Sequence, residues 1–265
     1  MLANGTDFYP TILSWTQTEN RGGVELDGCD LSRLLTTHPT DPTCVKDASG
    51  AVRDSMVHHF PHGNAQQSTL RTGDYKLIYN YGHIEGVPNP VPELELYRLS
   101  GEGNARVDIE EANNLAAAMP EKTQFMKKQL VDALDRMDAS RPYLNPRTTL
   151  PLPNKKKVCS PVKAKRKGAA VSLSFKENGS KVIKGYLMFT LNGGDNYEEW
   201  FRRDAVLDGK GRLTAELPKG TTHYLFNLVD EHGYMVSYPQ VDDMAYVEKK
   251  KIKFSSYALR VQEDK

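Results

Sequence analysis

The chain has 265 residues, which is enough for one large domain or two small ones. Hydrophobic residues make up 38 % of it and charged residues 26 %, a balance typical of a globular protein with a hydrophobic core. The formal net charge of +1 excludes a global field that would attract nucleic acid or an acidic partner, and no apolar run has the length of a membrane span.

The first residues and the cysteines give little information on the cellular compartment. MLANGTDFYP has no basic head followed by an apolar stretch, so no secretion signal is predicted. Cys29, Cys44 and Cys159 lie far apart in the sequence and match no metal-binding spacing. Because an odd number of cysteines is a poor disulfide framework, we interpret them as free thiols.

The first predicted element is an amphipathic helix that begins in TDFYPTILSW. Thr6 or Asp7 can cap it, and Phe8, Ile12 and Trp15 then recur at helical spacing. These three side chains are therefore expected to form the apolar face of the helix.

Three strands are predicted next, at SMVHHF (55–60), YKLIYNY (75–81) and ELELYRL (93–99). Gly73-Asp74 supplies the turn before the second strand. A second helix is predicted from Pro120 to about Asp138, with a buried stripe of Met126, Leu130, Leu134 and Met137. Residues 1–146 are thus expected to combine helices with a small antiparallel sheet.

The composition changes in residues 147–167. The surrounding stretch NPRTTLPLPNKKKVCSPVKAKRKG contains four prolines, and seven Lys or Arg lie between Lys155 and Lys167. The stretch is either a patch for nucleic acid or another anionic polymer, or a solvated linker. We favour a linker, because no aromatic residues lie between the charges for stacking on bases.

Residues 168–265 are predicted to form an all-β sandwich. AVSLSF, YLMFTL, RLTAEL and HYLFNL alternate apolar and polar residues, and Gly-rich turns separate them. The side chains expected on the inner faces of the first two strands are Val171, Leu173, Phe175, Leu187, Phe189 and Leu191. The predicted fold class of the whole chain is therefore α+β, a small antiparallel sheet with helices followed by a sandwich.

Histidines are concentrated in RDSMVHHFPHG, which places His58, His59 and His62 within five positions. A metal site is disfavoured, because neighbouring strand residues point to opposite faces and no carboxylate or cysteine stands at suitable spacing. Two interpretations stay open. Either one histidine is packed and one exposed as ordinary structure, or the loop contacts a substrate.

Nucleophilic catalysis has no good candidate in the sequence. There is no G-x-S-x-G elbow and no phosphate-binding glycine loop. Ser160 and Lys163 in SPVK match an S-x-x-K spacing, but the pair falls in the proposed linker, where no packed pocket is expected. No catalytic or metal-binding residue is assigned.

Six segments in order resemble the sulfatase family. TDFYPTIL followed by ELDGCDLSRLL resembles the segment that follows the family's catalytic core. RDSMVHHFPHG, LRTGDYKLIYNY, ELYRL and EEANNLAAAMPE then resemble its C-terminal subdomain, and RPYLNP resembles the tail. The resemblance covers roughly residues 5–146. It implies sulfuric ester hydrolysis on sulfated carbohydrates and a family that is often periplasmic or secreted.

The chain departs from that family in its catalytic motifs. Neither C-x-P-S-R nor C-x-P-x-R occurs, and CSPVK at Cys159 lacks the arginine. The family's calcium ligands would precede TDFYPTIL, so no cofactor is expected in this chain. The loop RLSGEGNARVDIEEANNLA is also longer than the family's. We therefore expect a C-terminal part of a sulfatase that is inactive alone. A non-catalytic glycan- or partner-binding module is the alternative.

The resemblance also implies roles for the histidines. Aligned on Phe60-Pro61, the family's loop histidines fall on His59 and His62, and His58 takes the place of an aromatic residue. His59 and His62 are expected to bind substrate, and His58 is expected to pack inward. The expected partner is a sulfated carbohydrate, bound together with a catalytic domain, with no nucleic acid and no membrane.

Overall fold

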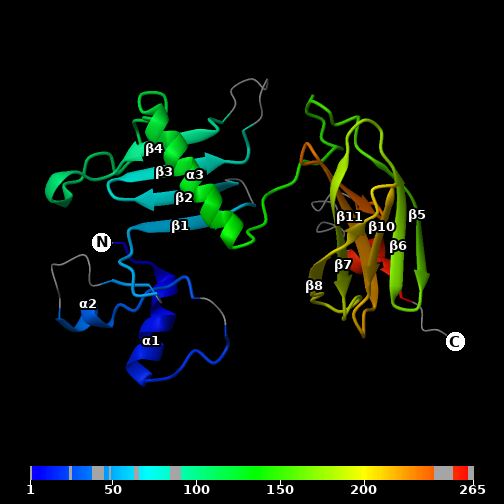
Figure 1. The fold of residues 1–265 in the computed structure, drawn as a ribbon, viewed down its shortest axis with the longest axis horizontal. Helices are drawn as coiled ribbons and strands as arrows, with labels where there is room; N and C mark the ends of the chain where they lie inside the picture. The colour runs from blue at the N-terminus through cyan, green and yellow to red at the C-terminus, as the bar shows by residue number, and fades with distance from the viewer. Residues whose placement is uncertain are drawn as a thin grey trace. The chain divides into compact units, whose positions relative to one another are not determined.

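The computed structural model describes residues 2–23, 26–37, 45–47, 49–62, 66–83, 91–241 and 253–261. The chain divides into two compact units, Met1–Pro142 and Tyr143–Lys265 (Figure 1). Unit 1 combines helices with one antiparallel sheet, and unit 2 consists mainly of antiparallel strands. The coarse α+β class predicted from the sequence is therefore confirmed. Cys44 lies outside the described residues.

Unit 1 begins with the short 3-10 helix η1 (Gly5–Asp7), which runs into α1 (Phe8–Thr16), and α2 (Ser32–Thr37) follows. The predicted helix is confirmed, and the predicted cap Asp7 is confirmed in position but not as a side-chain cap of α1. Asn4 is the capping residue, since its side chain accepts a hydrogen bond from the backbone N–H of Thr6. Asp7 stands at the N-cap of α1 without a side-chain capping bond, because its carboxylate is bound elsewhere in the unit.

A four-stranded antiparallel sheet follows, with strands in chain order: β1 (Ser55–Phe60), β2 (Gln67–Thr72), β3 (Tyr75–Asn80) and β4 (Leu94–Arg98). The three predicted strands correspond to β1, β3 and β4. The sequence did not single out β2, because QSTLRT has only one large apolar residue to carry an alternating pattern. Gly73 makes the turn between β2 and β3 with a φ of +51°, a conformation that glycine adopts at low cost.

One face of this sheet is covered by α3 (Pro120–Arg136), as Figure 1 shows. The shared core consists of Leu70, Leu77, Leu96, Met126, Leu130 and Leu134. The predicted helical stripe is thus confirmed for three of its four members. Met137 is the exception, because the helix ends at Arg136 and leaves its side chain exposed.

Unit 2 contains two antiparallel sheets. The first has the order β5-β6-β10-β9, formed by Ser160–Lys167, Ala170–Lys176, Arg212–Glu216 and Val206–Leu207. The second has the order β12-β11-β7-β8, formed by Met235–Tyr238, His223–Asp230, Val182–Thr190 and Trp200–Asp204. The short β13 (Leu259–Arg260) also pairs with β11, after the 3-10 helix η4 (Phe254–Tyr257).

The inner faces of the two sheets share one core, which includes Val171, Leu173, Phe175, Leu187, Phe189, Leu213 and Phe226. The four predicted strands are present as β6, β7, β10 and β11. Leu191 was predicted to face inward and is exposed instead, because β7 ends one residue earlier, at Thr190.

The predicted linker at 147–167 is wrong for residues 160–167, because they form β5, which pairs along its length with β6 and belongs to the first sheet. Unit 2 starts earlier, at Tyr143, whose hydroxyl lies 3.0 Å from that of Tyr186. A strand is compatible with this basic sequence for a physical reason. Edge strands tolerate proline at a bulge, and the pairing register shifts between Pro161 and Lys163.

Candidate functional site

The first candidate region centres on the carboxylate of Asp7, which is completely buried. Arg53 donates two hydrogen bonds to it, from Nη1 to Oδ2 at 2.9 Å and from Nη2 to Oδ1 at 2.7 Å. The backbone N–H groups of Cys29 and Asn4 donate to the same carboxylate at 2.8 and 2.7 Å. Burial alone would raise the pKa of Asp7, but these four donors outweigh it and lower the pKa below its ordinary value.

Thr11 adds a second connection in the same region. Its hydroxyl donates to the Asp7 carbonyl at 2.7 Å and accepts the N–H of Leu31 at 2.9 Å. Gly28 lies against the start of the chain so closely that an added Cβ would sit 2.1 Å from the Thr6 carbonyl oxygen. A side chain at position 28 is therefore excluded, which explains the glycine. Asp7 and Thr11 together hold three distant segments in one structure.

The apolar face predicted for α1 is present but does not pack inward. Phe8, Ile12 and Trp15 are 63 %, 52 % and 56 % exposed, and Tyr9 beside them is 54 % exposed. Thr11 is the only residue of the helix that is buried. Large apolar side chains gathered on one exposed helix face are typical of an interaction surface. We call these four residues the α1 apolar face.

The second candidate region is the histidine strand β1. The prediction that His58 is packed and His59 exposed is wrong, because the structure has His58 exposed and His59 partly buried. The pairing register explains the reversal. Val57 lies opposite Leu70 and packs on the α3 side of the sheet, so by alternation His59 points to that side and His58 to the other. The sequence does not say which face the helix covers.

Both ring nitrogens of His59 have partners. Nε2 lies 2.9 Å from the carbonyl oxygen of Ser140, which can only accept, so Nε2 carries a proton. In the neutral ring Nδ1 then accepts from the Ser68 hydroxyl at 2.6 Å, and the Ser68 oxygen accepts from Tyr81 at 2.7 Å. Burial raises the pKa of Tyr81, which keeps that hydroxyl protonated. Ser68 is fully buried, so this serine–histidine pair has no access to a substrate.

Solvent reaches His58 and His62. The His62 ring lies on the ring of Phe60, with centroids 4.1 Å apart, and Phe60 is itself exposed. Arg71 joins this side of the sheet, since it pairs with Met56, two residues before His58 on the strand. Its Nε is buried and has no hydrogen-bond partner among the described residues. Sequence reasoning missed Arg71, because only the strand pairing places it beside the histidines.

Comparison with models of known protein families and with curated proteins finds no match for this chain. In the described parts of the chain, no three His, Cys, Asp or Glu side chains gather where they could hold a metal ion. No helix among the described residues has the length and apolar character to cross a membrane.

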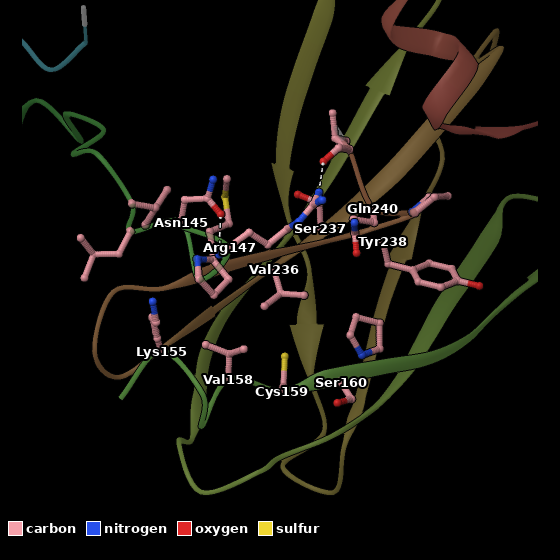
Figure 2. A pocket seen from close by; sticks show the side chains of 17 residues that line it. Asn145, Arg147, Lys155, Val158, Cys159, Ser160, Val236, Ser237, Tyr238 and Gln240 are labelled. Atoms are coloured by element: carbon pink, nitrogen blue, oxygen red, sulfur yellow. Dashed lines mark hydrogen bonds between the residues drawn. The ribbon is translucent and has the colours of Figure 1, made fainter. Parts of the chain in front are cut away.

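Unit 2 contains a pocket of about 750 Å³ between residues 143–147, the start of β5 and β12. Figure 2 shows Val158 and Cys159 beside Val236 in this pocket, with Arg147 and Lys155 at one side. The two cations hold loop carbonyls: Arg147 donates to Val241 at 3.4 Å, and Lys155 to Thr148 at 3.0 Å and to Leu150.

The polar groups of this pocket do not form a nucleophilic centre. Cys159 is buried, which raises the pKa of its thiol to about 11 and keeps it protonated at neutral pH. Ser160 accepts a hydrogen bond from Asn178 at 2.8 Å. Lys163, its partner in the S-x-x-K pattern, is exposed on the edge strand. The pocket is thus an open depression on unit 2 with a mixed apolar and polar lining.

Proposed function

We propose that unit 1 is the C-terminal subdomain of a sulfatase-type sulfuric ester hydrolase that acts on sulfated carbohydrates. One observation carries the proposal. Asp7 in TDFYPTIL binds both Cys29 in ELDGCDLSRLL and Arg53 in RDSMVHHFPHG, a contact between residues 46 positions apart. The segments whose order along the chain resembles one family are thus also joined by hydrogen bonds in the folded unit. This supports the proposal that unit 1 has the architecture of that family's subdomain.

The rest of unit 1 agrees with this interpretation. The segments from RDSMVHHFPHG to EEANNLAAAMPE form consecutive parts of one sheet and lead into its covering helix, from β1 to α3. RPYLNP, in contrast, crosses the boundary between the units at Tyr143. The α1 apolar face suits contact with a catalytic unit, because burying each large apolar side chain contributes about 1.5–3 kcal/mol. That unit would lie on the surface formed by Phe8, Ile12 and Trp15.

In the proposed enzyme, the catalytic unit and unit 1 would have different chemical roles. Sulfate ester hydrolysis needs a nucleophile and a cation that stabilises charge on the sulfuryl oxygens, and in the resembling family these are formylglycine and calcium. Unit 1 would contribute substrate contacts. The resemblance assigns them to His59 and His62, whereas exposure favours His58 and His62. Arg71 adds a guanidinium suited to a sulfate oxygen.

The test is to sequence the DNA upstream of the first codon and to express the joined reading frame. The expected result is an in-frame C-x-P-S-R or C-x-P-x-R motif and sulfate release from a sulfated sugar by the joined protein. The 265-residue chain alone, supplied with Ca²⁺, should release no sulfate from an aryl sulfate. Turnover by the purified chain that is lost on mutating one of its own residues would contradict the proposal, as would an upstream frame without either motif.

Substitutions in the joined protein test the substrate contacts separately. His58→Ala and His62→Ala should raise KM, because each removes a ring that solvent reaches on the substrate side. His232→Ala, in a turn of unit 2, is the matched control and should leave KM unchanged. If all three variants had the same KM, His58 and His62 would not be substrate contacts.

The alternative is a non-catalytic module that binds a glycan or a partner chain. It is favoured by the cationic side chains on β5, which need no catalytic partner to bind an anionic polymer. Binding of a sulfated glycan by a chain whose upstream frame lacks the catalytic motif would decide for this alternative.

A further inference from the structure

The basic sequence around residue 165 forms a strand, and this arranges its charges. Lys163 and Lys165 lie opposite Ser174 and Ser172 of β6, and Lys167 continues the alternation. The three lysines therefore point to one face of the sheet, spaced roughly 7 Å apart along the strand. That face is the outer one, because the alternate residues of β6 form the core. All three lysine side chains are exposed.

Neighbouring strands add to this face. Arg212 of β10 lies opposite Ser174, and its Nη2 donates to the Ser172 hydroxyl at 3.2 Å. Thr214 lies opposite Ser172 and continues a row of hydroxyl groups across the sheet. Lys176 stands at the end of β6 on the same face. On this face the middle strands carry small side chains with hydroxyl groups. The long cationic side chains therefore project above them.

The face is strongly positive. Its cationic residues are Lys163, Lys165, Lys167, Lys176 and Arg212, and we call them the β5 basic face. The nearby carboxylates include Glu216 and Asp204, which line a trough of about 730 Å³ together with Lys165, Lys167 and Arg212. Asp208 also lies near Arg212, whose charge helps to lower the pKa of that carboxyl. Among the described residues, the three β5 lysines form no ion pair with a carboxylate. Their charges are thus not neutralised within the sheet.

We propose that the β5 basic face binds a linear sulfated polysaccharide along the direction of β5. The regular row of ammonium groups matches a polymer that carries anionic groups at repeated positions. The hydroxyl groups of Ser174 and Thr214 donate to backbone carbonyls, which leaves their oxygens able to accept hydrogen bonds from sugar hydroxyls. The choice of a sulfated glycan among anionic polymers rests on the proposed function. The anionic character of the ligand rests on the charges alone.

Nucleic acid is the competing polyanion. Proteins that bind single strands combine a basic groove with aromatic platforms for the bases, and the described residues of this face carry no aromatic side chain. Hydroxyl groups between cations suit a sugar backbone better. Measuring the affinity of the same chain for both polymers therefore decides between a sulfated glycan and nucleic acid.

The experiment uses the full chain, with dextran sulfate as the probe and uncharged dextran and duplex DNA as comparisons. Binding is measured by fluorescence anisotropy of labelled polymers from low to physiological salt. Dextran sulfate should bind and uncharged dextran should not. The affinity for dextran sulfate should fall steeply as the salt concentration rises, because the lysines displace counterions condensed on the polymer.

The diagnostic variant is the triple substitution K163Q/K165Q/K167Q. It should weaken dextran sulfate binding about tenfold or more at low salt and flatten the salt dependence, because fewer counterions are released. The matched control K181Q/K184Q/K219Q removes the same charge from the start of β7 and from the turn after β10, and it should bind like the original chain. K163R/K165R/K167R keeps the charges and should retain the affinity even if the lysine stems also stabilise the strand.

Each outcome is decisive. Failure to bind dextran sulfate at low salt, or an equal loss in both glutamine triples, overturns the inference. Tighter binding of duplex DNA than of dextran sulfate would make the face a nucleic-acid site. Dextran sulfate binding through the β5 lysines by a chain whose joined protein releases no sulfate would refute the proposed function and leave this inference standing.

Discussion

Replacement of Asp7 by asparagine tests the contact on which the arrangement of unit 1 depends. The carboxylate is fully buried and its partner Arg53 has a side chain only 8 % exposed. Asparagine keeps the shape but removes the charge, and its NH₂ group faces donors that need an acceptor. Arg53 is then a buried cation without a counter-ion, and breaking such a pair costs about 3–5 kcal/mol. This is a large part of the roughly 5–15 kcal/mol that stabilises a domain.

Hydrogen exchange followed by mass spectrometry measures this loss within one sample. Peptides from unit 1 should lose protection in Asp7→Asn, and peptides from unit 2 serve as the internal reference. Asp132→Asn is the matched control, because it breaks the exposed Lys128–Asp132 pair on α3. Such a surface pair contributes only about 0.3–0.5 kcal/mol.

The pH dependence gives a second readout with a defined sign. The pKa of Asp7 is lower in the folded state than in the unfolded chain. Its contribution to stability is therefore complete above the unfolded value of about 3.9 and is lost as the pH falls through the folded pKa. The difference between the original chain and Asp7→Asn should shrink in that range. A loss below about 1 kcal/mol at pH 7, where a buried pair should cost several times more, would refute the assigned role.

Three further predictions follow from the same structure. His59→Ala should lower stability by about 1–3 kcal/mol, since it removes the hydrogen bonds that the ring makes to Ser68 and to the Ser140 carbonyl, whereas His58→Ala should change it by less than about 0.5 kcal/mol; urea unfolding of the two variants measures both. A fragment of residues 143–265 should fold and melt cooperatively, whereas residues 168–265 should not, because they lack β5; circular dichroism decides, and equal melting would contradict the boundary at Tyr143. The thiol of Cys159 should resist iodoacetamide at pH 8 until denaturant is added, because its pKa is about 11; fast alkylation of the folded chain would contradict its burial.

Local patterns predicted several elements well. Helical spacing identified α1, although its apolar face is exposed. Period-two alternation identified four strands of unit 2, and helical spacing identified α3, because burial on one face leaves a trace in the order of apolar residues. Strands without that trace were missed. Thr69 and Leu70 of β2 are buried between polar neighbours. In β5, lysines at alternate positions are separated by Ala164 and Arg166, a sequence without large apolar residues that is typical of a linker when the partner strand is unknown.

The sequence of residues 5–146 was sufficient to suggest the family resemblance, and local patterns were sufficient to predict the α+β class. Both depend on short segments that can be interpreted without knowing how the chain folds. The candidate surfaces needed the folded chain. Whether Phe8, Ile12 and Trp15 are buried or exposed, and which of two adjacent histidines α3 covers, depends on contacts between residues far apart in the chain. Periodicity predicts that a strand has two faces, but only pairing with other elements determines which face meets the core, and so which side chains remain available to a partner.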